Sequence, residues 1–220
     1  RNAATGQTVA PLIKVTPGNP EIITLPAQSQ NTGSFIAPRS VRISATSPVE
    51  VLQLEPYTEA TVEAKNGRQV IPDTALGNEY VVMGWPTQFL GVEANISAIS
   101  VVATSPGKTQ LSLVPRANIE GGLPASGILF AKANTPLEFQ LDYGDVLRIV
   151  TTGENGSDLT GSYIQSDLPV AVYSSHQCAR VPIETPGCNP LKIQIPPIKQ
   201  WGKEFVAVPF APRSGGDFSV

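Results

Sequence analysis

The one histidine of the chain, His176, follows Ser174 and Ser175, which raises the hypothesis of a serine nucleophile with a histidine base. Neighbouring side chains on a strand point to opposite faces, so Ser175 is badly placed to present its hydroxyl to the imidazole. Ser174 could share the face of His176, but the sequence places no acid to orient the ring, and no nucleophile-elbow pattern is present. The sequence therefore favours a packing role for this histidine and predicts that the protein is not an enzyme.

The two cysteines, Cys178 and Cys188, enclose a short segment that is rich in proline and glycine. In an oxidising compartment this spacing favours a disulfide, which stabilises a loop of this length by roughly 2–3 kcal/mol in the chain-entropy treatment. Two free thiols in a cytosolic protein are the alternative. One histidine and two cysteines cannot supply the three or four ligands of a zinc site, so we expect no metal and no cofactor.

Two asparagines, Asn95 and Asn155, stand in the Asn-X-Ser sequence at which secreted proteins receive N-linked glycans. Together with the cysteines, they indicate an extracellular protein that is secreted or held at the cell surface. Glu154 and Asp158 flank the second of these sequences, but they do not follow the EF-hand pattern. We therefore expect these carboxylates to bond to turn backbone rather than to calcium.

The chain has 220 residues, of which 41% are hydrophobic and 15% charged, so it is too apolar to be disordered; its formal net charge is −3. The negative charge argues against nucleic acid as a partner, because phosphate contacts need clustered lysine and arginine. No apolar run approaches 18 residues, so we expect no membrane insertion. The chain opens at Arg1 in polar sequence, which favours a piece of a longer protein.

Glycine and proline are spread between short apolar runs, as is typical of many short strands joined by turns. No segment keeps a 3.6-residue apolar period, so we expect an all-β fold with almost no helix. The Asn66-Gly67 pair between β-forming residues predicts a hairpin turn, and the prolines and glycine of residues 16–20 predict another between two short strands.

Two pairs of segments suggest an internal repeat. Residues 168–173 form an apolar strand with proline at its second position, and residues 47–52 hold a degenerate copy 121 positions earlier, since 169 − 48 = 121. Gly202 and Glu204 similarly follow Gly77 and Glu79 at 202 − 77 = 125 and 204 − 79 = 125. Repeats of this kind predict tandem β-sandwich-like modules of antiparallel strands.

The repeat predicts three parts: a first β-module over residues 1–84 that lacks its opening strand, and a second over residues 85–200 with the disulfide loop. Residues 201–220 then open a further repeat or return to complete the first module, because an unpaired apolar edge strand invites aggregation. In this alignment Trp201 takes the place of Leu76, so we expect its side chain inside. Trp85 is a candidate for a sugar-binding surface.

From residue 41 to residue 215 the sequence resembles the N-terminal domain of the IgGFc-binding protein family. The matching motifs are Pro-Val-Ala-Val at 169–172, Ser-His-Gln-Cys-Ala at 175–179, Cys-Asn-Pro-Leu at 188–191, Ile-Pro-Pro at 195–197, Trp-Gly-Lys-Glu-Phe-Val at 201–206, and earlier blocks at 75–80, 144–149 and 159–162. The loop between the cysteines is longer than the family pattern, and Pro190 departs from it.

The resemblance implies a non-enzymatic, β-rich module of a larger secreted, surface or matrix protein, with a structural or adhesive role. It implies protein partners or self-assembly, and it assigns immunoglobulin binding to no residue here. A lectin-like domain that binds a glycan or protein ligand is the alternative. A glycan array separates these two readings.

Overall fold

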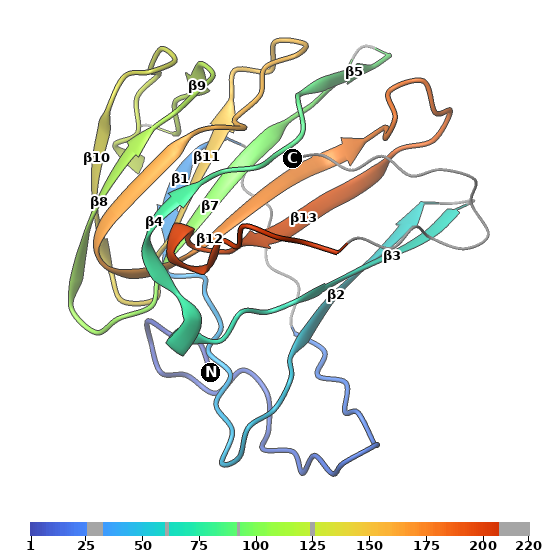
Figure 1. The fold of residues 1–220 in the computed structure, drawn as a ribbon, viewed down its shortest axis with the longest axis vertical. Coiled ribbons are helices and arrows are strands. Elements are labelled where there is room, and N and C mark those ends of the chain that lie inside the picture. The colour runs from blue at the N-terminus through green and yellow to red at the C-terminus, as the bar shows by residue number, and fades with distance from the viewer. Residues whose placement is uncertain (26–32, 60–61, 92, 124–125, 207–220) are drawn as a thin grey trace.

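The computed structural model describes residues 1–25, 33–59, 62–91, 93–123 and 126–206. The chain is all-β, as the sequence predicts, and its elements are labelled as in Figure 1. The strands are β1 Phe35–Ala37, β2 Leu52–Glu59, β3 Val62–Gln69, β4 Gly77–Val81, β5 Gln88–Leu90, β6 Glu93–Asn95, β7 Ser97–Ala103, β8 Lys108–Val114, β9 Ile119–Glu120, β10 Leu137–Asp142, β11 Val146–Thr151, β12 Tyr163–Ala179 and β13 Asn189–Ile195. Two 3₁₀ turns, η1 Asp73–Ala75 and η3 Ile198–Gln200, complete this part of the chain.

Strand β12 joins the two halves of the nine-stranded main sheet. The sheet runs in the order β1-β11-β7-β12-β8-β10, while β4 and β13 also pair with β12 and β9 pairs with β11. Figure 1 shows β12 as the long orange strand that runs across the molecule between β7 and β13. All the pairings are antiparallel. A pure antiparallel sheet suits the short connections that the glycines and prolines provide.

The two halves of β12 have different neighbours. Residues 163–166 pair with β8 and residues 170–176 pair with β7, while β4 and β13 follow each other along the opposite edge. The register shifts between Gln165 and Val170, which is where Pro169 removes a backbone donor. This irregularity lets one strand serve both halves of the sheet.

The core lies where the inward faces of these strands meet. In β8 every second side chain is buried, and Leu111 and Leu113 belong to the same core cluster as Ile99 and Val101 of β7. Tyr80 of β4 is fully buried, and its hydroxyl donates to the carbonyl of Val170 at 2.5 Å and accepts from the amide of Gly77 at 2.9 Å. Alternation with period two is what a strand with one buried face requires.

The internal repeat is not confirmed by the structure. Of its first organising segment, residues 47–51 form no strand, whereas residues 168–173 lie in β12. The Asn-Gly hairpin prediction is wrong, because Asn66 and Gly67 lie within β3, opposite Glu55 and Leu54 of β2. β2 ends at Glu59 and β3 begins at Val62, and the two residues between them lie outside the described part of the chain.

The predicted division at residues 84 and 85 remains a prediction, and the strands join residues on both sides of it. β1 and β4 precede the boundary and pair with β11 and β12 beyond it. Residues 201–206 carry no strand, and the rest of the predicted returning segment, residues 207–220, lies outside the described residues. Among the described residues, no helix is long and apolar enough to cross a membrane.

The N-terminal arm, residues 11–25, has only one of its predicted features. The turn is present, with the Asn19 amide donating to the Thr16 carbonyl at 3.1 Å, but the described arm forms no strands on either side of it. Leu12 and Ile22 are among its exposed large apolar side chains. The chain start is held by the backbone bridge between Asn2 and Val41 and by the Arg1 amino group on the Arg42 carbonyl.

Candidate functional site at the disulfide end of the sheet

A disulfide closes the loop between β12 and β13. Cys178 is buried near the end of β12, and it is bonded to Cys188 just before β13, with 5.2 Å between their Cα atoms. Ala179 and Asn189 are paired beside it after an irregularity in the ladder. The bond therefore holds together the base of a loop over residues 180–187.

A second set of contacts ties this loop to the hairpin of β5 and β6. The side chain of Gln88 donates to the Arg180 carbonyl at 3.1 Å and accepts from the Arg180 amide at 2.8 Å. The Gln88 side chain thus satisfies the hydrogen bonding of both the amide and the carbonyl of Arg180, as a neighbouring strand would. Directly after β6, the Ile96 amide donates to the side-chain oxygen of Gln177 at 2.9 Å. The loop is a fixed surface at the position where the hairpin meets it.

Apolar side chains at this end of the molecule face solvent. Val181 is 48% exposed, Ile183 is 55% exposed, and Phe89 of β5 is 47% exposed. Burial of such side chains against a partner is favourable at about 25 cal/mol per Å² of apolar surface. Since the disulfide and Gln88 already hold the backbone, a partner would lose little free energy in ordering it.

The two candidate glycosylation asparagines lie beside this surface. Asn155 is exposed, and its side-chain oxygen accepts a hydrogen bond from the amide of Phe89 at 3.2 Å. Asn95 ends β6, paired with Gln88, and is half-buried. The loop that carries Asn155 is held next to the start of β5 by the Thr87 amide, which donates to the Ser157 carbonyl at 2.8 Å.

His176 is buried in β12, two residues before Cys178. Its Nε2 is 3.1 Å from the Pro86 carbonyl, so the neutral ring donates there from Nε2, and its Nδ1 is buried without a hydrogen-bond partner. Burial lowers the pKa of His176, against smaller opposing effects from the Pro86 carbonyl and the charge of Asp158. The ring ties the segment that follows β4 to β12.

The structure brings together residues that sequence reasoning kept apart. Ser97 lies opposite His176 where β7 pairs with β12. Ser174 and Asp158 both lie beside Gly84: a Cβ at Gly84 would be 3.1 Å from Ser174 Oγ and 3.7 Å from Asp158 Oδ1. Asp158 acts on the imidazole through its charge, while its Oδ1 accepts hydrogen bonds from Thr160. The hydroxyl of Ser97 and Nδ1 of the ring both lack hydrogen-bond partners, so these two atoms do not form a nucleophile–base pair.

Asp158 bonds to turn backbone, as expected, and Asp145 in the turn between β10 and β11 does the same. Asp158 Oδ1 accepts from the amide of Thr160 at 2.9 Å, and Asp145 Oδ2 accepts from the amide of Asp142 at 3.0 Å. In the described part of the chain, no three His, Cys, Asp or Glu side chains gather closely enough to hold a metal ion.

The two tryptophans differ from their expectations. Trp201 is 52% exposed, so the prediction that it packs inside is wrong; Leu76, its supposed equivalent, is 4% exposed. The indole nitrogen of Trp201 is 3.4 Å from the Pro196 carbonyl, which fixes the ring at the surface. Trp85 is half-buried and its indole nitrogen is buried without a partner, so the ring does not form an open sugar-binding platform.

An antiparallel β-module with a disulfide-stapled loop is thus the class of protein that the fold and the site define. The family described as IgGFc binding protein matches residues 66–220, and this chain belongs to that family. The chain is 28% identical over 214 residues to the IgGFc-binding protein of Homo sapiens, which confirms the resemblance. That match covers 94% of this chain but 4% of the human protein, and no solved structure matches the chain.

Proposed function

We propose that this chain is a non-enzymatic extracellular module with a structural or adhesive role, which binds a protein partner through its disulfide end. The observation that carries the proposal is the exposed apolar group of Val181, Ile183 and Phe89 on backbone that the disulfide and Gln88 hold in place. Preformed apolar surfaces with polar surroundings are typical of protein-binding sites. The module would belong to a larger secreted, surface or matrix protein.

An extracellular location is supported by the disulfide, because such bonds persist in oxidising compartments. It is also supported by Asn155, which is exposed and lies in a glycosylation sequence. A glycan at Asn155 would stand next to Phe89, at the margin of the proposed binding surface. Treatment of protein secreted by eukaryotic cells with an N-glycosidase would then convert Asn155, and Asn95 if it is modified, to aspartate.

The name of the human relative supplies the first partner to test, the Fc fragment of immunoglobulin G. If Fc is the partner, the Ile183→Asp variant should weaken binding at least tenfold in surface plasmon resonance, with an unchanged melting temperature. Leu129→Asp is the matched control, because Leu129 is also exposed but lies away from the disulfide loop, in the segment before β10. Equal loss in both variants, or loss in the control alone, would place the binding surface elsewhere.

The lectin-like alternative rests on a different feature, a hollow of about 330 Å³ lined by Asn78, Glu79, Gln165, Ser166, Pro197 and Lys199. Its polar groups suit the hydroxyls of a sugar. A glycan array with the wild type and Gln165→Ala separates the two functions: a specific glycan that the variant loses would favour a lectin.

The proposal that the module is not an enzyme has its own test at Ser174 and His176. A serine-reactive fluorophosphonate should leave the folded protein unlabelled, because both side chains are buried. Labelling of Ser174 that is lost in His176→Ala would contradict it.

A further inference from the structure

We propose that this module self-associates head to tail: the N-terminal arm of one molecule adds as a strand to the free edge of β10 in a second copy. The inference concerns surfaces far from the disulfide end and does not depend on the proposed partner there. It starts from two features that the fold leaves exposed, an apolar groove beside an edge strand and an apolar segment without a strand.

The first feature is the β10 groove, formed by residues 127–132, Thr135 and residues 137–139. It has a volume of about 460 Å³ and is lined mainly by apolar side chains, among them Leu129, Phe130, Leu137 and Phe139. Leu129 is 80% exposed and Phe130 is 56% exposed. Leu137 and Phe139 pack against the core from one side, so the groove continues the apolar face of the sheet outward.

The second feature of this surface is the backbone of β10 itself. β10 is the last strand in the sheet order, and β8 is its one strand partner among the described residues. The edge of such a strand carries backbone donors and acceptors that can pair with an added strand. Groove and edge together would receive an extended peptide whose apolar side chains alternate with polar ones.

The arm of this chain has that pattern. The alternation covers residues 13–15, where Ile13 and Val15 flank Lys14, and all three side chains are exposed. The further apolar side chains Ile22, Ile23 and Leu25 follow the turn at residues 16–19 and are exposed as well. Soluble monomers rarely leave so many large apolar side chains in contact with water, and such surfaces mark interaction sites.

Charge selects residues 12–15, rather than 21–25, as the added strand. The side chains of β10 that alternate with Leu137 and Phe139 are Glu138, Gln140 and Asp142, all exposed. In this row Gln140 is neutral and Asp142 is already paired with Lys108 at 3.1 Å, so Glu138 carries the charge that an added strand would meet. A strand that places Ile13 and Val15 beside the apolar positions brings Lys14 towards Glu138, and opposite charges on neighbouring strands attract. The later stretch begins with Glu21, which the same row would repel.

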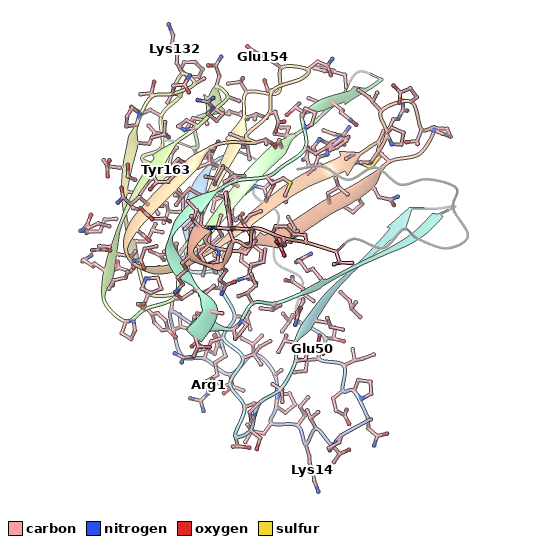
Figure 2. All side chains as sticks on the ribbon, in the orientation of Figure 1. Arg1, Lys14, Glu50, Lys132, Glu154 and Tyr163 are labelled. Carbon is pink, nitrogen blue, oxygen red and sulfur yellow. A yellow bond between two sulfur atoms is a disulfide. The ribbon has the colours of Figure 1, made fainter. Side chains whose placement is uncertain are left out.

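A second copy, and not the same molecule, is the occupant. Figure 2 places Lys14 and Lys132, one in the arm and one in the groove, at opposite ends of the long axis of the molecule. Arg1 and Asn2 fix the start of the chain to residues 41 and 42 at the arm's own end. A contact between two different surfaces of identical molecules does not close on itself, so it extends into open chains unless the rotation forms a ring.

Sedimentation velocity over a concentration series tests this self-association. The wild type should form species larger than a dimer, and the arm variant Ile13→Asp and the groove variant Phe130→Asp should each weaken association at least tenfold. Both positions are exposed in the monomer, so both variants should fold. An equal mixture of the two should stop at the dimer, because it offers one intact arm and one intact groove per pair. The matched control, Met83→Asp, should associate as the wild type does, because Met83 is 49% exposed but belongs to neither the arm nor the groove.

Two further measurements fix the contact. Lys14→Glu and Glu138→Lys should each weaken association, and the double variant should restore it. A synthetic peptide of residues 9–25 should end chain growth, whereas one of residues 201–210 should not. A wild type that stays monomeric at every concentration, a mixture that grows beyond the dimer, or inhibition by the 201–210 peptide alone would each overturn the proposal.

Discussion

At the scale of single residues, the protonation state of the buried His176 affects the stability of the fold. His176 is 3% exposed and donates to the Pro86 carbonyl, while its second nitrogen has no partner. A proton on that nitrogen would place an uncompensated charge in the layer between β12 and the segment after β4. Among the described residues, the charge of Asp158 acts on the ring and opposes the effect of burial in part.

The first prediction is that acid destabilises the fold through His176. Burial lowers the pKa of the folded histidine below its unfolded value of about 6.5, so the unfolded chain binds the proton more readily. The histidine's contribution to stability is therefore fully present above that unfolded pKa and is lost as the pH falls towards the folded pKa. Urea unfolding from pH 7.5 down to pH 4.5 should show it as a difference between the wild type and His176→Gln. Parallel curves for the two proteins would contradict the prediction.

Tyr80 gives a second prediction at this scale. Removal of its hydroxyl in Tyr80→Phe leaves the Gly77 amide and the Val170 carbonyl buried without that partner, at a cost of roughly 1–3 kcal/mol. Tyr163→Phe is the control, because its hydroxyl bonds Glu79 at the surface, and it should cost less than about 0.5 kcal/mol. Denaturant unfolding measures both, and equal costs would show that the buried hydroxyl has no special role.

The residue scale also shows what sequence alone could supply at the site. Cys178, Cys188 and His176 are found from their types and spacing. Asp158 is not, because the loop of residues 152–162 reaches the ring only after Thr87 binds Ser157 and positions that loop. The roles of Gln88 and Gln177 are equally unpredictable from the sequence, since a glutamine that hydrogen-bonds to loop backbone cannot be told from any polar surface residue.

At the scale of elements, the alternation of apolar residues predicts β-strands well and their partners poorly. Residues 168–173 are recognisable as an apolar strand, yet β12 extends over 17 residues through Pro169 and pairs with four strands. The Asn-Gly signal fails because the pairing of Leu52 with Gln69 sets a register that carries Asn66 and Gly67 into β3. Local turn propensity is weak beside eight paired positions.

The third prediction concerns the disulfide loop as an element. Alkylation of the native protein without reduction should find no free thiol, and the Cys178→Ala, Cys188→Ala double variant should lose roughly 2–3 kcal/mol of stability. Hydrogen exchange should quicken in residues 179–188 of the double variant and remain slow in β7 and β11, whose pairing does not involve the loop. Two alkylated cysteines in the native protein, or loss of protection throughout the sheet, would contradict this account.

At the scale of the whole molecule, the sheet is continuous across the boundary that the sequence repeat suggests. β1 and β4 belong to the predicted first module, but they pair with β11 and β12 of the second, and Tyr80 and Val82 complete its core. The first of two similar sequence segments, residues 76–83, contains β4, whereas the second, residues 201–206, is exposed and carries no strand. Sequence similarity between short apolar segments does not determine which strand each segment pairs with.

The last prediction decides between two self-sufficient modules and one sheet. If the division at residues 84 and 85 separates modules, a fragment of residues 85–200 should fold alone. The strand pairing predicts that it does not, because the fragment lacks β4 along half of β12 and leaves the space of Tyr80 and Val82 open, at a cost that exceeds about 5 kcal/mol for two large core side chains. A fragment of residues 33–206 keeps β1, β4 and η3 and is the matched control; it should unfold in one cooperative transition by calorimetry and near-ultraviolet circular dichroism. A cooperative transition in the 85–200 fragment would establish the module division, and the packing of β4 against β12 would then be a contact between two folding units.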